Sequence, residues 1–246
     1  MTNEQPARPS APPSPPRRDP PWRVDVPWPF LPVMLLVMTG IAIMAFFAVS
    51  RFFSRFPGMI REGAVQASIL LAVLLMFALI PPIGNVAGKL GVRKLRPGDL
   101  GFVLLGLLLI YLWQFFTLPL WSNFLDACDL AVEQRQVLLV ECGRSSTLGF
   151  LEMLAVAGVL IPFVEEVVFR RLIFGFCRPV GMWTALIATS LIFAAAHDFL
   201  YGLPALFGLG AVFQLQYLRT GNLLAPVLTH MIFNLISLTL VFAQSG

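Results

Sequence analysis

Seven apolar runs of about 20 residues constrain this chain more than any other feature. They cover 30–50, 64–86, 100–120, 148–177, 180–198, 200–218 and 222–243. A helix of about 20 apolar residues crosses the hydrocarbon core of a bilayer, and in lipid the backbone must bond to itself. We therefore expect an all-α polytopic membrane protein, a bundle of about seven transmembrane helices within a range of roughly six to eight.

The composition agrees with a membrane bundle. Hydrophobic residues make up 58% of the chain and charged residues 12%, with a mean hydropathy of +0.82, whereas a soluble domain carries about 25% charged residues. The net charge is +4, and the basic residues stand at the ends of the apolar runs. At such positions they set orientation and meet anionic lipid, so membrane lipid is an expected partner and nucleic acid is not.

The chain divides into three parts by composition. Residues 1–28 are rich in proline and arginine and predict a disordered tail. Residues 29–144 hold N-terminal transmembrane helices and a polar loop, and residues 145–246 form a transmembrane core that carries the candidate catalytic groups. Cys128 and Cys142 share the polar loop and would form a disulfide in an oxidising compartment, or remain free thiols otherwise.

The first motif, Glu165-Glu166-x-x-x-Arg170, lies inside the run 148–177. Ionised side chains in the bilayer cost several kcal/mol, so they persist there for function or in pairs. Glu166 and Arg170 lie about 40° apart on a helix, in the order that favours an ion pair. Glu165 points about 100° away from Glu166, so we expect it to face a cavity while the other two support each other.

Two further motifs contain the only histidines of the chain. They are Phe193-x-x-x-His197 and His230-x-x-x-Asn234, each inside an apolar run. Counting along the helices places Glu165 and His197 roughly 20 Å from a shared hairpin end. His230 and Asn234 lie roughly 12 to 18 Å from the same side. The similar depth predicts a single polar pocket within the membrane.

The chemistry that suits such a pocket is the addition of water to a carbonyl group. A carboxylate beside a neutral imidazole can hold a water and take its proton, which Glu165 and His197 would supply. A second imidazole and an amide N–H can stabilise the oxyanion that develops, which His230 and Asn234 would supply. Together these groups predict hydrolysis of a peptide bond.

The three motifs in this order, EExxxR, FxxxH and HxxxN, resemble the CAAX-protease and bacteriocin-processing family, also called CPBP or Abi. This family of intramembrane endopeptidases includes the type II CAAX prenyl proteases, and the resemblance covers about 145–243. It implies a protease of the bacterial cytoplasmic membrane that acts on a peptide or membrane-anchored protein, lipidated or not.

The resemblance also implies a role for each matching position. Glu165 activates water with His197 as its partner, Glu166 and Arg170 form the supporting ion pair, and His230 and Asn234 stabilise the oxyanion. It further favours a mechanism without a metal or other cofactor.

Three alternatives remain open from the sequence. Glu165, His197 and His230 could instead form a His₂Glu zinc site with an open position. Glutamate, histidine and arginine inside spans also build proton relays, which would suit a proton-coupled transporter, although no inverted repeat is visible. The same fold could also serve as a catalytically silent immunity or scaffold protein.

Overall fold

The computed structural model describes residues 30–52, 55–56, 58–79, 86–130 and 146–243. In these ranges the chain is helical and contains no strand. The expected disordered tail 1–28 lies outside the described residues. So does Cys142, and its pairing with Cys128 therefore stays a prediction.

The described part of the chain contains seven long helical segments, one for each apolar run. They are α1 (Phe30–Phe52), α2 (Gly58–Leu79), α4 (Pro97–Ala127), a composite helix over 147–177, α9 (Met182–Ala195), α10 (Leu203–Thr220) and α11 (Leu224–Ala243), with a short α3 (Val86–Leu90) between α2 and α4. Four helical stretches are long and apolar enough to span a bilayer by length and composition: Gly58–Ala78, Pro97–Ala127, Thr147–Val180 and Leu224–Ala243. The expected all-α polytopic fold is confirmed.

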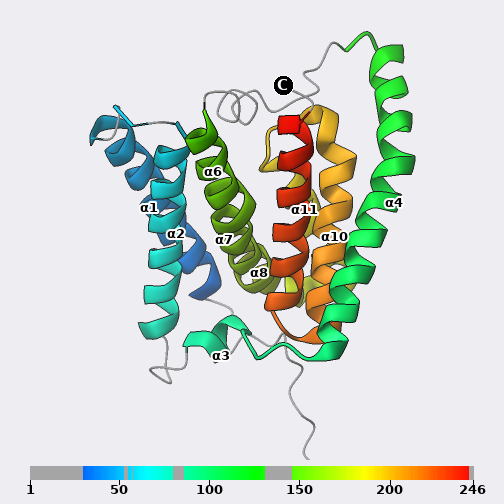
Figure 1. Ribbon diagram of the computed structural model, residues 1–246. Helices are drawn as coiled ribbons and strands as arrows, with labels where there is room; N and C mark the ends of the chain where they lie inside the picture. The colour runs from blue at the N-terminus through cyan, green and yellow to red at the C-terminus, as the bar shows by residue number, and fades with distance from the viewer. Residues whose placement is uncertain (1–29, 53–54, 57, 80–85, 131–145, 244–246) are drawn as a thin grey trace, which may run out of the picture.

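The helices stand side by side, as Figure 1 shows, with α1 and α2 at one edge and α4 at the other. The composite helix lies between α2 and α11, and α10 lies between α11 and α4. α9 packs against α10 as an antiparallel hairpin. The composite helix, α9, α10 and α11 therefore surround the interior of the bundle, where the three sequence motifs lie.

The lower end of the bundle in Figure 1 is the basic end. It holds the start of α4 and the turn between α10 and α11, and its basic side chains are Lys89, Arg93, Lys94, Arg96 and Arg219. The positive-inside rule places such an end in the cytoplasm. Because α1 starts at this end, the same rule predicts that Phe30, the first described residue, lies toward the cytoplasm.

The start of α4 is fixed to the α10–α11 turn by a shared carboxylate. Asp99 accepts a hydrogen bond from the Arg96 backbone N–H at 3.0 Å, which caps the helix, and Pro97 occupies the first turn. The same carboxylate accepts from the side-chain amide of Asn222 at 3.2 Å. α4 is therefore held beside α10 at its N-terminal end.

The sequence predicted one continuous helix over 148–177, but the composite helix is not uniformly α-helical. It runs through α6 (Thr147–Ala155), a π segment η1 (Val156–Leu160), α7 (Ile161–Val167), a second π segment η2 (Val168–Ile173) and α8 (Phe174–Cys177). Glu165 and Glu166 lie in α7, the short α-helical piece between the two wider segments. Such π segments often occur at functional sites.

α9 ends earlier than the run 180–198 predicted. Its last residue is Ala195, so His197 lies in the turn that follows and not inside a span, which corrects the sequence interpretation. The cause is local, because Asp198 has a φ of 46° and a right-handed helix cannot continue through that conformation. The chain then enters a short 3₁₀ turn, η4 (Leu200–Gly202).

Candidate active site

A buried ion pair forms the base of the site. Arg170 Nε donates to Glu166 Oε2 at 2.7 Å and Arg170 Nη2 donates to Oε1 at 3.3 Å, with both side chains completely buried. Arg170 Nη1 donates to the carbonyl of Gly210 in α10 at 3.0 Å. Gly210 also allows α9 to approach closely, since a Cβ there would lie 3.1 Å from Ser190 Cα. The pair thus connects the composite helix to α10.

Two phenylalanine rings enclose the guanidinium of Arg170. Its Cζ atom lies 5.5 Å from the ring centre of Phe193 and 5.7 Å from that of Phe213, within the range of cation–π attraction. Phe193 is fully buried and packs edge-on against Phe169. Phe193, the first residue of the FxxxH motif, therefore has a packing role.

Glu166 also orients His230. The imidazole Nδ1 lies 3.1 Å from Glu166 Oε1, and since Glu166 is paired with Arg170 as a carboxylate, Nδ1 carries the proton and donates it. The ring stacks on Phe213 with 4.6 Å between ring centres and 24° between planes. These two contacts leave Nε2 of His230 directed toward the neighbouring glutamate.

Glu165 lies between the two histidines. His197 Nε2 is 3.8 Å from Glu165 Oε1, and His230 Nε2 is 3.7 Å from Glu165 Oε2. The Glu165 and His197 side chains are 20% and 19% exposed, whereas His230 is 3% exposed. The structure thus brings the three titratable groups together. Both separations exceed a direct hydrogen bond, and a water can be the common partner.

The backbone of α9 fixes the ring of His197. Its Nδ1 lies 2.8 Å from the carbonyl oxygen of Phe193, which can only accept a hydrogen bond, so Nδ1 carries a proton. In the neutral ring Nε2 therefore has the lone pair, and this atom faces Glu165. The four-residue spacing of the FxxxH motif sets this tautomer even though His197 lies beyond the end of the helix.

Asn234 is engaged with the composite helix. Its side-chain amide donates to the carbonyl oxygen of Ala157 at 2.9 Å. That carbonyl lacks a helical donor, because the N–H of Ile161 bonds to Val156 and Pro162 has no N–H. One amide hydrogen of Asn234 therefore satisfies a backbone group that the π segment exposes. The second amide hydrogen is the one that an oxyanion role would use.

We predict that Asn234→Ala destabilises the protein by about 1–3 kcal/mol, because the Ala157 carbonyl then stays buried without a donor. Pro162→Ala restores a backbone N–H at the position that can reach this carbonyl. In the Pro162→Ala background, Asn234→Ala should therefore cost less. Unfolding free energies of the four proteins in mild detergent measure this coupling.

A zero coupling energy between these two positions would contradict the structural role of Asn234. Thr239→Ala in the same helix is a matched control, since its hydroxyl bonds only within α11, to the Leu235 carbonyl. We expect Thr239→Ala to change the free energy of unfolding by the same amount with and without Pro162→Ala.

The sequence analysis missed Glu62 of α2. This carboxylate is near enough for its charge to act on Glu165, and Gln66 donates to it at 2.9 Å. The apolar run predicted a helix from residue 64, whereas α2 begins at Gly58, so Glu62 was assigned to a loop. A glutamate one turn before a glutamine, just ahead of the run, was the available signal.

Arg171, which follows the motif arginine Arg170, is also buried inside the bundle. It is 3% exposed, and it donates to the hydroxyl of Tyr217 and to the backbone carbonyl of Lys89. The π segment η2 turns this side chain into the bundle between α3 and α10. Within the part of the chain that the structure describes, no carboxylate is hydrogen-bonded to this buried charge.

The zinc alternative can be compared with the geometry of the described residues. Among them, no group of three histidine, cysteine, aspartate or glutamate side chains is arranged to hold a metal ion. Because Nδ1 of both histidines donates a hydrogen bond, Nε2 of each ring, which faces Glu165, is the nitrogen that a zinc ion would use. We derive no catalytic step through a metal, and a metal-free reaction stays a prediction.

The part of the chain that carries the site matches a known protein family. Residues 147–236 match the family model described as "Type II CAAX prenyl endopeptidase Rce1-like". The chain is 28% identical over 153 residues to "Membrane-embedded CAAX protease MroQ" of Staphylococcus aureus, covering 59% of this chain and 60% of that protein. It is 30% identical over 83 residues to "Putative membrane peptidase YdiL" of Bacillus subtilis, covering 33% and 34%.

A third relative is the "Uncharacterized 24.3 kDa protein" of Escherichia coli, 38% identical over 79 residues, which cover 30% of this chain and 36% of that one. The chain thus spans less than two thirds of the length of each relative, and no solved structure matches it. The resemblance that the three motifs indicated is nevertheless confirmed: residues 147–236 of this integral membrane protein match the model of the type II CAAX prenyl endopeptidase family.

Proposed function

We propose that the protein is an intramembrane endopeptidase that hydrolyses a peptide bond with a water activated by Glu165, without a metal. One observation carries the proposal. The Nε2 atoms of His197 and His230, from separate elements, lie 3.8 and 3.7 Å from the two oxygens of the Glu165 carboxylate. The relatives named as membrane proteases support the same class of reaction.

In the first step Glu165 acts as the general base. A water between Glu165 and His197 gives one proton to the carboxylate while its oxygen attacks the peptide carbonyl. The lone pair of His197 Nε2 accepts the other water proton as a hydrogen bond and so orients the attack. The 2.8 Å bond from Nδ1 to the Phe193 carbonyl holds the ring for this task.

His230 stabilises the tetrahedral oxyanion as an imidazolium. Its Nδ1 proton is committed to Glu166, so donation from Nε2 to an oxyanion requires the second proton. Before the attack, the negative charges of Glu165 and Glu166 balance the positive charges of Arg170 and the His230 imidazolium. The remaining amide hydrogen of Asn234 is the second donor in the proposal.

In the second step the tetrahedral intermediate collapses. The C–N bond breaks, and Glu165 returns the proton it took from water to the departing amine. The products are a carboxylic acid and an amine, which become a carboxylate and an ammonium when the acid passes its proton to the amine, and the enzyme regains its starting protonation state.

The location of the site suggests the class of substrate. Glu165 and His197 are each only about one-fifth exposed and lie among helices that carry lipid-facing side chains. A substrate must therefore bring its peptide bond into the bundle. We infer a peptide next to a membrane anchor, either a hydrophobic segment or a lipid, as the name of the staphylococcal relative also suggests.

Cleavage in a defined bilayer tests the proposal. The purified protein in liposomes is incubated with membrane-anchored peptides, and the new N-termini are identified by mass spectrometry. We expect a new N-terminus that depends on Glu165 and persists with a strong chelator. Cleavage lost with chelator and restored by zinc would overturn the metal-free mechanism. Proton uptake driven by a pH gradient, without any cleavage, would favour the transporter instead.

A further inference from the structure

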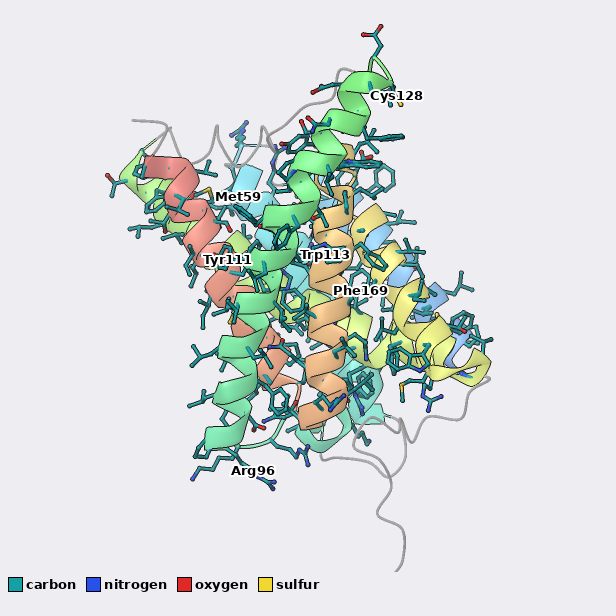
Figure 2. All side chains as sticks on the ribbon, turned by 90° about the vertical axis from the view of Figure 1, so that its right-hand side faces the viewer. Met59, Arg96, Tyr111, Trp113, Cys128 and Phe169 are labelled. Atoms are coloured by element: carbon teal, nitrogen blue, oxygen red, sulfur yellow. The ribbon has the colours of Figure 1, made fainter. Side chains whose placement is uncertain are left out.

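A second cavity lies away from the candidate active site, between α4 and α10. Its volume is about 280 Å³, and its walls are mainly the apolar side chains of Phe102, Leu105, Leu109, Val212 and Leu215. Figure 2 views the bundle from this side, with α4 in front of α10, Trp113 near mid-height and Arg96 at the lower end. The cavity is below the size of most drug-like sites, about 300–1,000 Å³, and suits a single hydrocarbon chain.

Gln216 supplies one polar group in the cavity wall. Its amide nitrogen donates to the Phe102 carbonyl at 2.6 Å and to the Thr229 hydroxyl at 2.9 Å. Gly106 makes this possible, because any Cβ there would collide with the amide. Since the carbonyl can only accept, the orientation of the amide is fixed.

The oxygen of the same amide has no donor. Gln216 is 4% exposed, and its Oε1 is buried without a hydrogen-bond partner among the described residues. A buried acceptor without a donor is unfavourable, because it has given up its hydrogen bonds to water. This atom therefore indicates a ligand that can offer an O–H or N–H group.

Arg219 adds a positive charge to the same wall. It lies three residues after Gln216, about 4.5 Å further along α10, and its side chain is exposed. No hydrogen bond or ion pair engages it within the described part of the chain. It belongs to the basic end of the bundle, beside Arg93, whose guanidinium is held by the carbonyls of Thr220 and Gly221.

We propose that this cavity is a binding site for an acidic phospholipid whose headgroup carries free hydroxyls. One acyl chain lies between the apolar side chains of α4 and α10, and the phosphate binds Arg219. A headgroup hydroxyl donates to Gln216 Oε1. The lipid fits by charge, since a juxtamembrane arginine contributes about 1 kcal/mol toward an anionic lipid. The α10 residues that line the site lie about 60° to 160° around the helix from Phe213, and the site is independent of the proposed hydrolysis.

Native mass spectrometry of the purified full chain, with phosphatidylglycerol, phosphatidylcholine or phosphatidylmethanol at equal concentrations, tests the site. We expect phosphatidylglycerol to bind about fivefold more tightly than phosphatidylcholine. Arg219→Gln should remove this preference, and Leu105→Trp should reduce binding of every lipid by filling the cavity. Phosphatidylmethanol carries the same single negative charge but no headgroup hydroxyl, so it should bind more weakly than phosphatidylglycerol.

Matched variants separate the site from general lipid contact. Lys94→Gln removes one charge at the same end, and Leu104→Trp adds the same bulk on α4 outside the cavity, where Leu104 is 69% exposed. Both should bind phosphatidylglycerol like the unmodified protein. Equal losses for Lys94→Gln and Arg219→Gln, or for Leu104→Trp and Leu105→Trp, would overturn the proposal. If the unmodified protein bound all three lipids with equal affinity, that result alone would overturn the proposal.

Discussion

Glu165→Gln should reduce peptide cleavage by about 10³- to 10⁴-fold, because glutamine keeps the shape of the side chain but cannot take a proton from water. The variant should remain folded, since Glu165 makes no direct hydrogen bond to either histidine. Product formation per protein, measured in liposomes with the same membrane-anchored peptide, quantifies the loss.

Glu152→Gln is the matched control for that experiment. It removes a carboxylate from the same composite helix, 13 residues earlier in the chain, and should leave cleavage nearly unchanged. If purified Glu165→Gln cleaved at a rate close to that of Glu152→Gln, the proposed base would be wrong. Equal melting temperatures of the two variants would exclude misfolding as the cause of a loss.

Arg170→Gln should destabilise the protein by about 3–5 kcal/mol, because it leaves the Glu166 carboxylate buried without its cation. Glu166 is completely buried, so the charge has no access to water as compensation. The Gly210 carbonyl also loses its donor in this variant. Equilibrium unfolding in mild detergent measures the change in free energy.

The double variant Glu166→Gln/Arg170→Gln gives the sharper comparison. Removing both charges should cost less than the sum of the two single changes, since neither partner is then left as an isolated ion. Arg219→Gln, on the exposed end of α10, should change stability little. Additive effects at Glu166 and Arg170 would mean that the pair contributes no coupling energy.

The sequence predicted the helices well because the hydrocarbon thickness imposes one length on every span. Each of the seven runs contains a helix, with limits that differ by a few residues at most positions. The ion pair between Glu166 and Arg170 was also predictable, because partners four residues apart on one helix need no tertiary information. α4 continues to Ala127, beyond the apolar run, and Trp121 in this extension donates a hydrogen bond to the carbonyl oxygen of Leu200 at 2.9 Å.

The features that the sequence did not predict depend on contacts between helices. The π segment η1 exposes the Ala157 carbonyl, and only the distant Asn234 satisfies it. The position of His197 in a turn depends on the left-handed backbone of Asp198. The electrostatic influence of Glu62 comes from a helix about 100 residues earlier in the chain. Hydropathy and motif spacing carry none of this information.

The arrangement of Glu166 and Arg170 on one helix bears on how the chain enters the membrane during synthesis. A charged residue near the centre of a span costs about 2.5–3.5 kcal/mol at the insertion step. Because these two partners are joined by a single helical turn, they can neutralise each other before any neighbouring helix has arrived. The newly made segment can therefore partition into lipid early, and the aromatic enclosure around Arg170 can be completed later, when α9 and α10 assemble.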